Sequence, residues 1–231
     1  ILNGRNGLEG DYGTPEGHLT APQPWRAWEA CMTMNESWGY NKWDTNWKSV
    51  KDLLKMLGTA SAWHGNLLLN IGPRGDGSIP EASVKAMERI AEWMATNREA
   101  VIGTDPFTFG FEERRPGDRS DWGHQGRYTA SGNNLYVLAS KWPGSEFGIA
   151  GLETAVKRVS ILGDAGEYPF TYENKRLQIS GLPAEPPDDE CPVLKIECEQ
   201  PPEIYRTGGL RIPKVPHPPY DPCPSDIAQA E

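Results

Sequence analysis

The fold is decided by a near-continuous apolar run, GNLLLNIGP, at residues 65–73. Apolar residues without alternation are typical of a strand buried on both faces, as in parallel sheets, and Gly72-Pro73 favours a turn that ends it. The stretch before it, residues 47–62, has the periodicity of a helix. Its apolar positions at helical spacing are Val50, Leu53, Leu54 and Leu57.

The same alternation of strand and helix extends on both sides of this pair. Residues 30–34 (ACMTM) indicate an earlier strand. Ser78 and Glu81 predict a capping box, with Pro80 in the first turn, for a helix that runs to about residue 100. Its predicted buried stripe is Val84, Met87, Ile90, Ala91 and Met94. We therefore expect residues 1–103 to be the C-terminal part of a (β/α) TIM-like barrel, because a whole barrel needs about 250 residues.

The pattern changes after Thr104 to short strands separated by turn residues, which favours an antiparallel β-sandwich over residues 104–199. A hairpin is predicted from strands at 127–130 and 135–139 around Gly132. Further strands are predicted at residues 156–162, 170–173, 177–179 and 193–197. Residues 200–231 are rich in Pro and are predicted to form a disordered tail.

Composition excludes several classes of function. The 231 residues carry 23 basic and 32 acidic side chains, a formal charge of -9, so nucleic acid is not an expected partner. No apolar run approaches the roughly 20 residues that span a bilayer. The four His and four Cys lack the spacing of metal ligands, so no metal or cofactor is expected, and a disulfide involving Cys223 stays open. Because the chain begins at Ile1 rather than Met, we expect it to be a piece of a longer protein.

Three side chains are candidates for a functional site, although each also fits a structural role. Glu16 lies in GDYGTPEG at residues 10–17, where Pro15 fixes the backbone just before a carboxyl group that could protonate a glycosidic oxygen. Arg5 offers a planar fork of hydrogen-bond donors, and by itself it fits a surface turn. Trp38 follows the strand at 30–34 and so falls at the C-terminal face of a barrel, where barrel enzymes place their sites.

Three segments in this order carry a family resemblance: residues 10–16, residues 31–41 (CMTMNESWGYN) and residues 65–73. The chain resembles the C-terminal half of a retaining α-L-fucosidase of glycoside hydrolase family 29. The resemblance implies that Glu16 is the general acid/base and that Arg5 and Trp38 contact the sugar, with the indole lining the pocket for its methyl group. It also implies an aspartate nucleophile on an earlier strand, upstream of Ile1, so this chain alone is expected to be inactive.

Other features of the same region have simpler interpretations. Asn6 stands where the family usually has Trp. The glycosylation sequon at Asn35 is discounted because modification there would block the proposed site. The glycine-rich stretch 72–77 lacks the ending of a phosphate-binding loop and is predicted to be a tight turn.

The implied function is that of an exo-α-L-fucosidase acting on fucosylated oligosaccharides or glycoconjugates, with no nucleic-acid or membrane partner. Family resemblance points to a secreted, periplasmic or lysosomal compartment. Two alternatives stay open: a non-catalytic carbohydrate-binding or interaction module, and a related barrel glycosidase with another sugar specificity.

Overall fold

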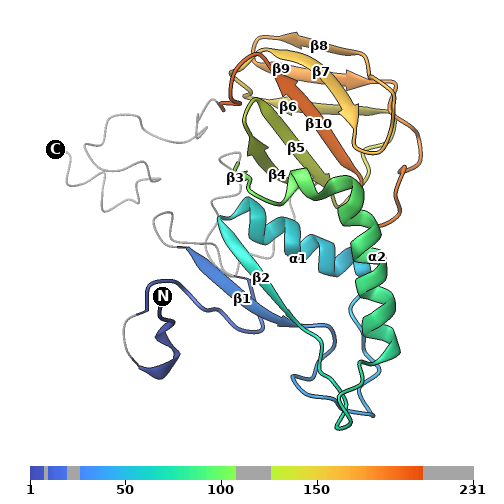
Figure 1. Cartoon of the computed structure of the whole chain (residues 1–231). Coiled ribbons are helices and arrows are strands. Elements are labelled where there is room, and N and C mark those ends of the chain that lie inside the picture. The colour runs from blue at the N-terminus through green and yellow to red at the C-terminus, as the bar shows by residue number, and fades with distance from the viewer. Residues whose placement is uncertain (8–9, 20–26, 108–125, 205–231) are drawn as a thin grey trace, which may run out of the picture.

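The computed structural model describes residues 1–7, 10–19, 27–107 and 126–204, which form four layers (Figure 1). The first is a parallel sheet of β1 (Trp28–Thr33) and β2 (Gly65–Asn70), and the second holds the helices α1 (Val50–Ala62) and α2 (Glu81–Asn97). The third is an antiparallel sheet with the order β3 (Asp105–Pro106), β4 (Gly126–Ser131), β5 (Asn134–Ala139), β10 (Val193–Cys198) and β7 (Val156–Ile161). The fourth has the order β6 (Glu146–Ala150), β9 (Arg176–Ser180) and β8 (Phe170–Glu173). Two 3₁₀ turns complete the fold, η1 (Gly4–Asn6) and η2 (Arg98–Ala100).

Two further chain segments extend the sheet in parallel orientation: residues 12–17 lie beside β1, and the segment around Asn3 lies beside residues 12–17. Bridges pair Asn3 with Tyr12, Gly13 with Trp28 and Glu16 with Cys31, all in parallel orientation. The segment around Pro15 is not a continuous strand, because proline has no N–H to donate to the ladder. Since all four segments run in the same direction, their carboxyl ends meet at one edge of the sheet.

Helix α1 covers only one face of this parallel sheet. Trp28, Ala30 and Met32 are buried against Ala60 of α1 and its neighbours. Leu68 points to the other face and is 50% exposed. The prediction that this strand is buried on both faces is therefore wrong. Within the described residues β2 pairs only with β1, and no second layer covers the face opposite α1.

A capping box at Ser49 and Asp52 sets the start of α1, the helix before β2. Ser49 accepts a hydrogen bond from the backbone N–H of Asp52, and the Asp52 carboxylate accepts one from the Ser49 N–H, so α1 starts at Val50 within the predicted range. The capping box predicted for the next helix is wrong. The Ser78 hydroxyl donates to Asp76 instead, and α2 begins at Glu81 without a side-chain cap.

The buried face of α2 also differs from the predicted stripe. Val84 and Met87 are exposed, as is Ala91, whereas Ile90 and Met94 are partly buried. The fully buried positions of this helix are Ser83, Trp93 and Asn97. The buried face is rotated because α2 packs around the indole of Trp93, which contacts the chain near Cys191. The spacing of apolar residues within α2 does not reveal this contact.

The two antiparallel sheets share one apolar core, in which β5 and β10 are central. Leu135, Val137, Leu194 and Ile196 face β9 of the outer sheet, and their alternate neighbours Tyr136, Leu138 and Val193 pack on the helices. The predicted hairpin is present as β4 and β5, with Gly132 at a φ of 54° in its turn. Strands β3 and β6 were not predicted. The Pro-rich tail beyond residue 204 lies outside the described residues.

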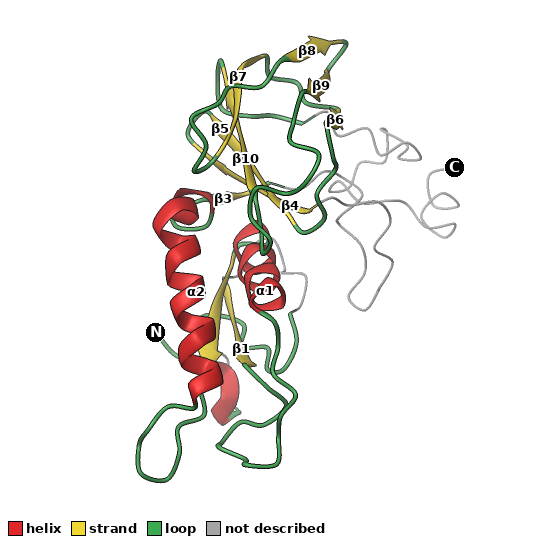
Figure 2. Cartoon of the chain, turned by 90° about the vertical axis from the view of Figure 1, so that its right-hand side faces the viewer, coloured by secondary structure: helices red, strands yellow, loops and turns green. Residues whose placement is uncertain are grey.

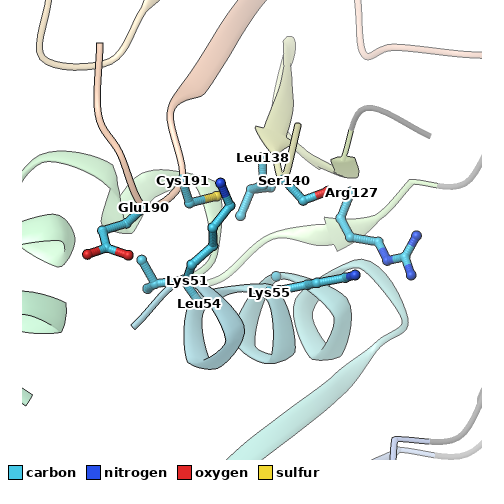
Figure 3. A pocket seen from close by; sticks show the side chains of 9 residues that line it. Lys51, Leu54, Lys55, Arg127, Leu138, Ser140, Glu190 and Cys191 are labelled. Atoms are coloured by element: carbon cyan, nitrogen blue, oxygen red, sulfur yellow. The ribbon is translucent and has the colours of Figure 1, made fainter. Parts of the chain in front are cut away.

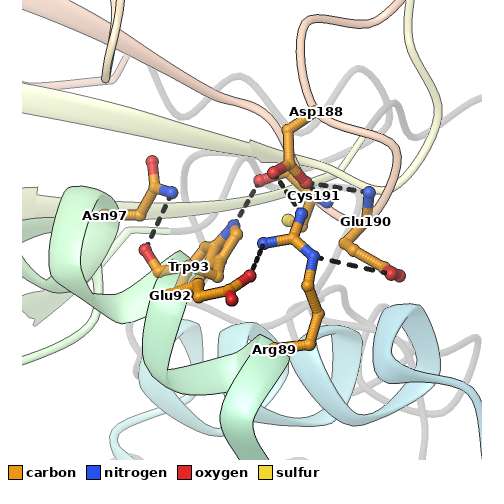
Figure 4. Close-up of polar contacts among 7 residues, drawn as sticks. All are labelled: Arg89, Glu92, Trp93, Asn97, Asp188, Glu190 and Cys191. Atoms are coloured by element: carbon orange, nitrogen blue, oxygen red, sulfur yellow. Dashed lines mark hydrogen bonds and ion pairs between the residues drawn. The ribbon is translucent and has the colours of Figure 1, made fainter. Parts of the chain in front are cut away.

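Helix α1 therefore lies between two sheets, and Figure 2 shows it between β1 and β4. Trp93 is 1% exposed and its Nε1 donates to the Cys191 carbonyl at 2.6 Å. Arg89 Nη2 lies 2.5 Å from Asp188 Oδ2 (Figure 4). The Thr129 hydroxyl donates to the Ala100 carbonyl at 2.6 Å. These contacts join residues about 30 to 100 positions apart and fix the helix layer to the five-stranded sheet.

We expect Trp93→Ala to lower the free energy of unfolding by about 3–5 kcal/mol, because it leaves a large cavity between α2 and the β10 region. Trp93→Phe should cost about 1–3 kcal/mol, since the Cys191 carbonyl would lose its donor. Urea denaturation followed by circular dichroism measures both. Ile102→Ala, at an exposed position, is the control, and a Trp93→Ala variant as stable as this control would contradict the packing described here.

Acidification should weaken the same interface through Asp188. Burial raises the pKa of this carboxyl, but the hydrogen bond from Arg89 and the N–H groups of Cys191 and Glu190 outweigh it, so the pKa lies below its ordinary value. A lowered pKa stabilises the folded state at neutral pH, and this contribution is lost as the pH falls through the lowered value. Between about pH 5 and about pH 3, Asp188→Asn should therefore lose less stability than the parent. Thermal melts across this range, with Asp189→Asn as control, test the difference; equal slopes would contradict it.

Candidate functional site

The carboxyl edge of the parallel sheet gathers the three residues singled out from the sequence. Glu16 pairs with Cys31: the Cys31 N–H donates to Pro15 O at 3.0 Å, and the Gly17 N–H donates to Cys31 O at 2.9 Å. Paired residues in a parallel ladder share a face, and Cys31 alternates with the residues buried under α1. The Glu16 side chain, 46% exposed, therefore stands on the face that α1 leaves uncovered.

Arg5 reaches Glu16 from the neighbouring segment. Its turn, η1, begins directly after Asn3, whose side chain caps it by accepting from the Arg5 N–H at 3.3 Å. Arg5 Nη1 donates to Glu16 Oε2 in a direct ion pair. Gly10 lets the chain pass close to this turn, since a Cβ there would lie 2.4 Å from Gly4 N. The structure thus brings together two of the three predicted residues, eleven positions apart.

Trp38 lies on the loop that follows β1 at the same edge. Its side chain is 44% exposed, and its carbonyl accepts from Asn70 Nδ2 at 2.6 Å, at the end of β2. Figures 1 and 2 show the loops after β1 and β2 reaching the same end of the molecule. Trp38 therefore lies on the loop that directly follows β1, the strand with which Glu16 pairs.

Asp44 orders this loop from within. Its carboxylate accepts from the Ser37 hydroxyl at 2.7 Å and from the Glu36 N–H at 3.0 Å, and its Oδ1 accepts from the Asn46 N–H at 3.1 Å. The hydrogen bond from Ser37, with those from the two N–H groups, holds the pKa of Asp44 below its ordinary value. Asn35 is 7% exposed and its Oδ1 accepts from the Ser37 N–H, which agrees with discounting the sequon.

Two neighbours of Glu16 have no catalytic role predicted from the sequence. His18 Nδ1 lies 2.8 Å from the Glu16 carbonyl, a contact in which the ring nitrogen donates. Glu29 is two residues before Cys31 in β1, so it shares the uncovered face with Glu16. The parallel pairing of residues 13–17 with β1 places Glu29 beside Glu16, and Pro15 conceals that pairing in the sequence.

The glycine-rich stretch at 72–77 forms the predicted turn. Gly77 N donates to Arg74 O at 2.9 Å, and Arg74 N donates to Ser78 O at 2.8 Å. Asp76 accepts from the hydroxyl and the N–H of Ser78, so its carboxylate serves the turn itself.

A small pocket lies away from this edge, where α1 meets the five-stranded sheet (Figure 3). It has a free volume of about 10 Å³, room for about one water molecule rather than a sugar. Its lining includes Lys51 and Lys55 of α1, Arg127 of β4, and Glu190. In the described part of the chain, no three His, Cys, Asp or Glu side chains are arranged to hold a metal ion, and no helix there has the length and apolar character of a membrane span.

Comparison with protein families matches residues 2–99 to the family described as Alpha-L-fucosidase. That range contains all three candidate residues and the whole carboxyl edge. Over residues 2–99 the chain is therefore similar to α-L-fucosidases. The match ends just before β3, so this similarity rests on the parallel sheet and its helices.

Relatives in this family resemble a larger part of the chain. The alpha-L-fucosidase of Branchiostoma floridae is 31% identical over 121 residues, 51% of this chain and 25% of that protein. The human tissue alpha-L-fucosidase is 28% identical over 172 residues, 71% of this chain and 34% of that protein. The solved structure of alpha-L-fucosidase isoenzyme 1 from Paenibacillus thiaminolyticus has a TM-score of 0.69 at 28% identity and covers 83% of this chain and 46% of its own. The chain thus spans a quarter to a half of the length of these fucosidases.

We expect Asn70→Ala to loosen the loop that carries Trp38, because the Trp38 carbonyl loses its side-chain donor. Loss of one such hydrogen bond should speed amide exchange in residues 36–47 about fivefold. Hydrogen exchange measured by mass spectrometry reports this change directly. Asn66→Ala, on an exposed side chain of the same strand, is the matched control, and equal exchange in the two variants would contradict the role of Asn70.

Proposed function

We propose that the chain is part of a retaining exo-α-L-fucosidase, a glycoside hydrolase that releases L-fucose from fucosylated oligosaccharides or glycoconjugates. One observation carries this proposal: Glu16 stands at the carboxyl edge of a parallel sheet, on the face without helices, in contact with Arg5. Barrel enzymes place their catalytic groups at this edge. The match of residues 2–99 to the fucosidase family supports it.

For the architecture, we propose that residues 1–103 are the C-terminal part of a (β/α) barrel and that residues 104–199 form a β-sandwich. Four parallel segments with helices on one face support the first assignment. Two antiparallel sheets around a common core support the second. Residues 200–231 are proposed to be a separate Pro-rich tail. In a closed barrel the face that carries Glu16 would turn toward the interior.

Glu16 is proposed to act as the general acid/base. It would protonate the glycosidic oxygen as the bond to fucose breaks, and then take a proton from the water that releases the sugar. A retaining mechanism requires a second carboxylate about 5–5.5 Å from the first, as nucleophile. Among the described residues we assign no nucleophile; that it lies on an earlier strand of the barrel stays a prediction.

Arg5 and Trp38 are proposed to bind the sugar. A guanidinium has five N–H donors, so Arg5 can orient the Glu16 carboxylate with one of them and offer others to sugar hydroxyls. The indole of Trp38 is an apolar surface that suits the methyl group of a 6-deoxy sugar. The compartment, secreted, periplasmic or lysosomal by resemblance, stays a prediction.

Glu16→Gln tests the central assignment in the protein produced from its complete coding sequence. We expect kcat/KM for a fucoside with a poor leaving group to fall by about a hundredfold to ten-thousandfold, because the amide cannot donate the required proton. An aryl fucoside with a good leaving group should be less affected in its first step.

Glu36→Gln is the control, because Glu36 is an exposed carboxylate on the loop after β1. It should hydrolyse both substrates at close to the parent rate. Unchanged hydrolysis of the poor substrate by Glu16→Gln would refute Glu16 as acid/base. A parent protein that binds fucosides without hydrolysing them would favour the carbohydrate-binding alternative, and hydrolysis of another glycoside in preference would favour a different sugar specificity.

A further inference from the structure

An unusual amount of aromatic surface is exposed on the loop after β1. Tyr40 is 46% exposed and Trp43 is 81% exposed, within five residues of Trp38. Large aromatic side chains usually bury most of their surface, so an indole this exposed lacks the favourable free energy of burial. Such exposure on an ordered segment indicates a surface that binds a partner.

The segment is held in place by specific contacts. Asp44, next to Trp43, accepts hydrogen bonds from the chain at both ends of the loop, at Glu36 and at Asn46. The Trp43 N–H donates to Asn41 Oδ1 at 3.0 Å. The guanidinium of Arg74, from the turn after β2, lies 5.4 Å from the centre of the Tyr40 ring. The two rings are therefore presented from a fixed backbone, which lowers the entropic cost of binding.

The position of the loop after β1 indicates which kind of partner it binds. It leaves the carboxyl end of β1 and is bound at Trp38 to the end of β2, so it belongs to the edge where Glu16 stands. A general acid protonates the oxygen between the fucose and the group that leaves. The leaving group must therefore extend from Glu16 over the loops at this edge, and the loop after β1 is one of them.

The chemistry around the rings suits a sugar better than an apolar protein surface. Lys42 Nζ lies 4.7 Å from the centre of the Trp43 ring, and Asn41 and Asp44 are neighbours in the chain. A pyranose has an apolar C–H face for an aromatic ring and hydroxyl groups around its rim for such polar side chains. An apolar partner would instead bury the ammonium group and the carboxylate at a cost.

We propose that Tyr40 and Trp43 form a platform for the sugar unit to which the fucose is attached, so that the substrate is a fucosylated oligosaccharide with at least one further pyranose. This proposal rests on the function proposed above and names its substrate class. Trp43 stacks on that pyranose and Tyr40 extends the platform toward the turn after β2.

The test compares two substrates in the protein produced from its complete coding sequence. One is an aryl α-L-fucoside and the other a fucosylated lactose trisaccharide. Trp43→Ala should raise KM for the trisaccharide about tenfold and leave kcat/KM for the aryl fucoside within about twofold. Trp43→Phe keeps an aromatic ring and should restore most of the trisaccharide KM. Ile102→Ala, another exposed apolar side chain, should change neither substrate.

Other outcomes overturn the platform. Equal losses on both substrates would mean that Trp43 supports the fold of the loop, and no loss on either would mean that the ring contacts no sugar. A change of molar mass in light scattering on Trp43→Ala, with unchanged kinetics, would make the surface a contact between copies of the protein.

Failure of the proposed function itself would be visible separately, as a parent protein that hydrolyses neither substrate. In that case the trisaccharide is titrated while tryptophan fluorescence is recorded. Binding that Trp43→Ala abolishes would still support the platform, and absence of binding would overturn it.

Discussion

Parallel pairing is the constraint on which the rest of this molecule depends. A single register joins the segment at 13–17 to β1 and β1 to β2, and it places every carboxyl end at one edge. Arg5 and Glu16 meet only because their segments leave this edge side by side. The loop after β1 is bound to the end of β2 through Asn70 for the same reason. No single local motif produces this arrangement; it follows from strand direction.

Strands and helices could be predicted from the sequence where the spacing of apolar residues and the position of turn residues indicated the same element. The helix at α1, the strands at β1 and β2 and the hairpin around Gly132 could be predicted in this way, because apolar spacing and a glycine with positive φ leave few alternatives. The buried face of α2 could not be predicted. Its orientation depends on Trp93 reaching Cys191, nearly a hundred residues later, and a helical wheel contains no such contact.

The candidate residues were found by their chemistry and by family resemblance, whereas their proximity came only from the structure. The ion pair between Arg5 and Glu16 requires the close passage of Gly10 past Gly4, which the sequence does not display. Glu29 was given only a structural role, because proline interrupts the segment whose pairing with β1 places it beside Glu16. The roles of Glu16, Arg5 and Trp38 in catalysis stay predictions, as do the boundaries of the domains.

The packing of the helices against the five-stranded sheet limits how this protein can be divided. Leu54, Trp93 and Val101 face side chains of β5 and β10, such as Tyr136 and Val193, across the boundary proposed near residue 103. A chain truncated at that boundary would expose this apolar surface to solvent and would be prone to aggregate. The five-stranded sheet thus covers the apolar side of the helices, and the two should be kept together as one unit when segments of such proteins are recombined.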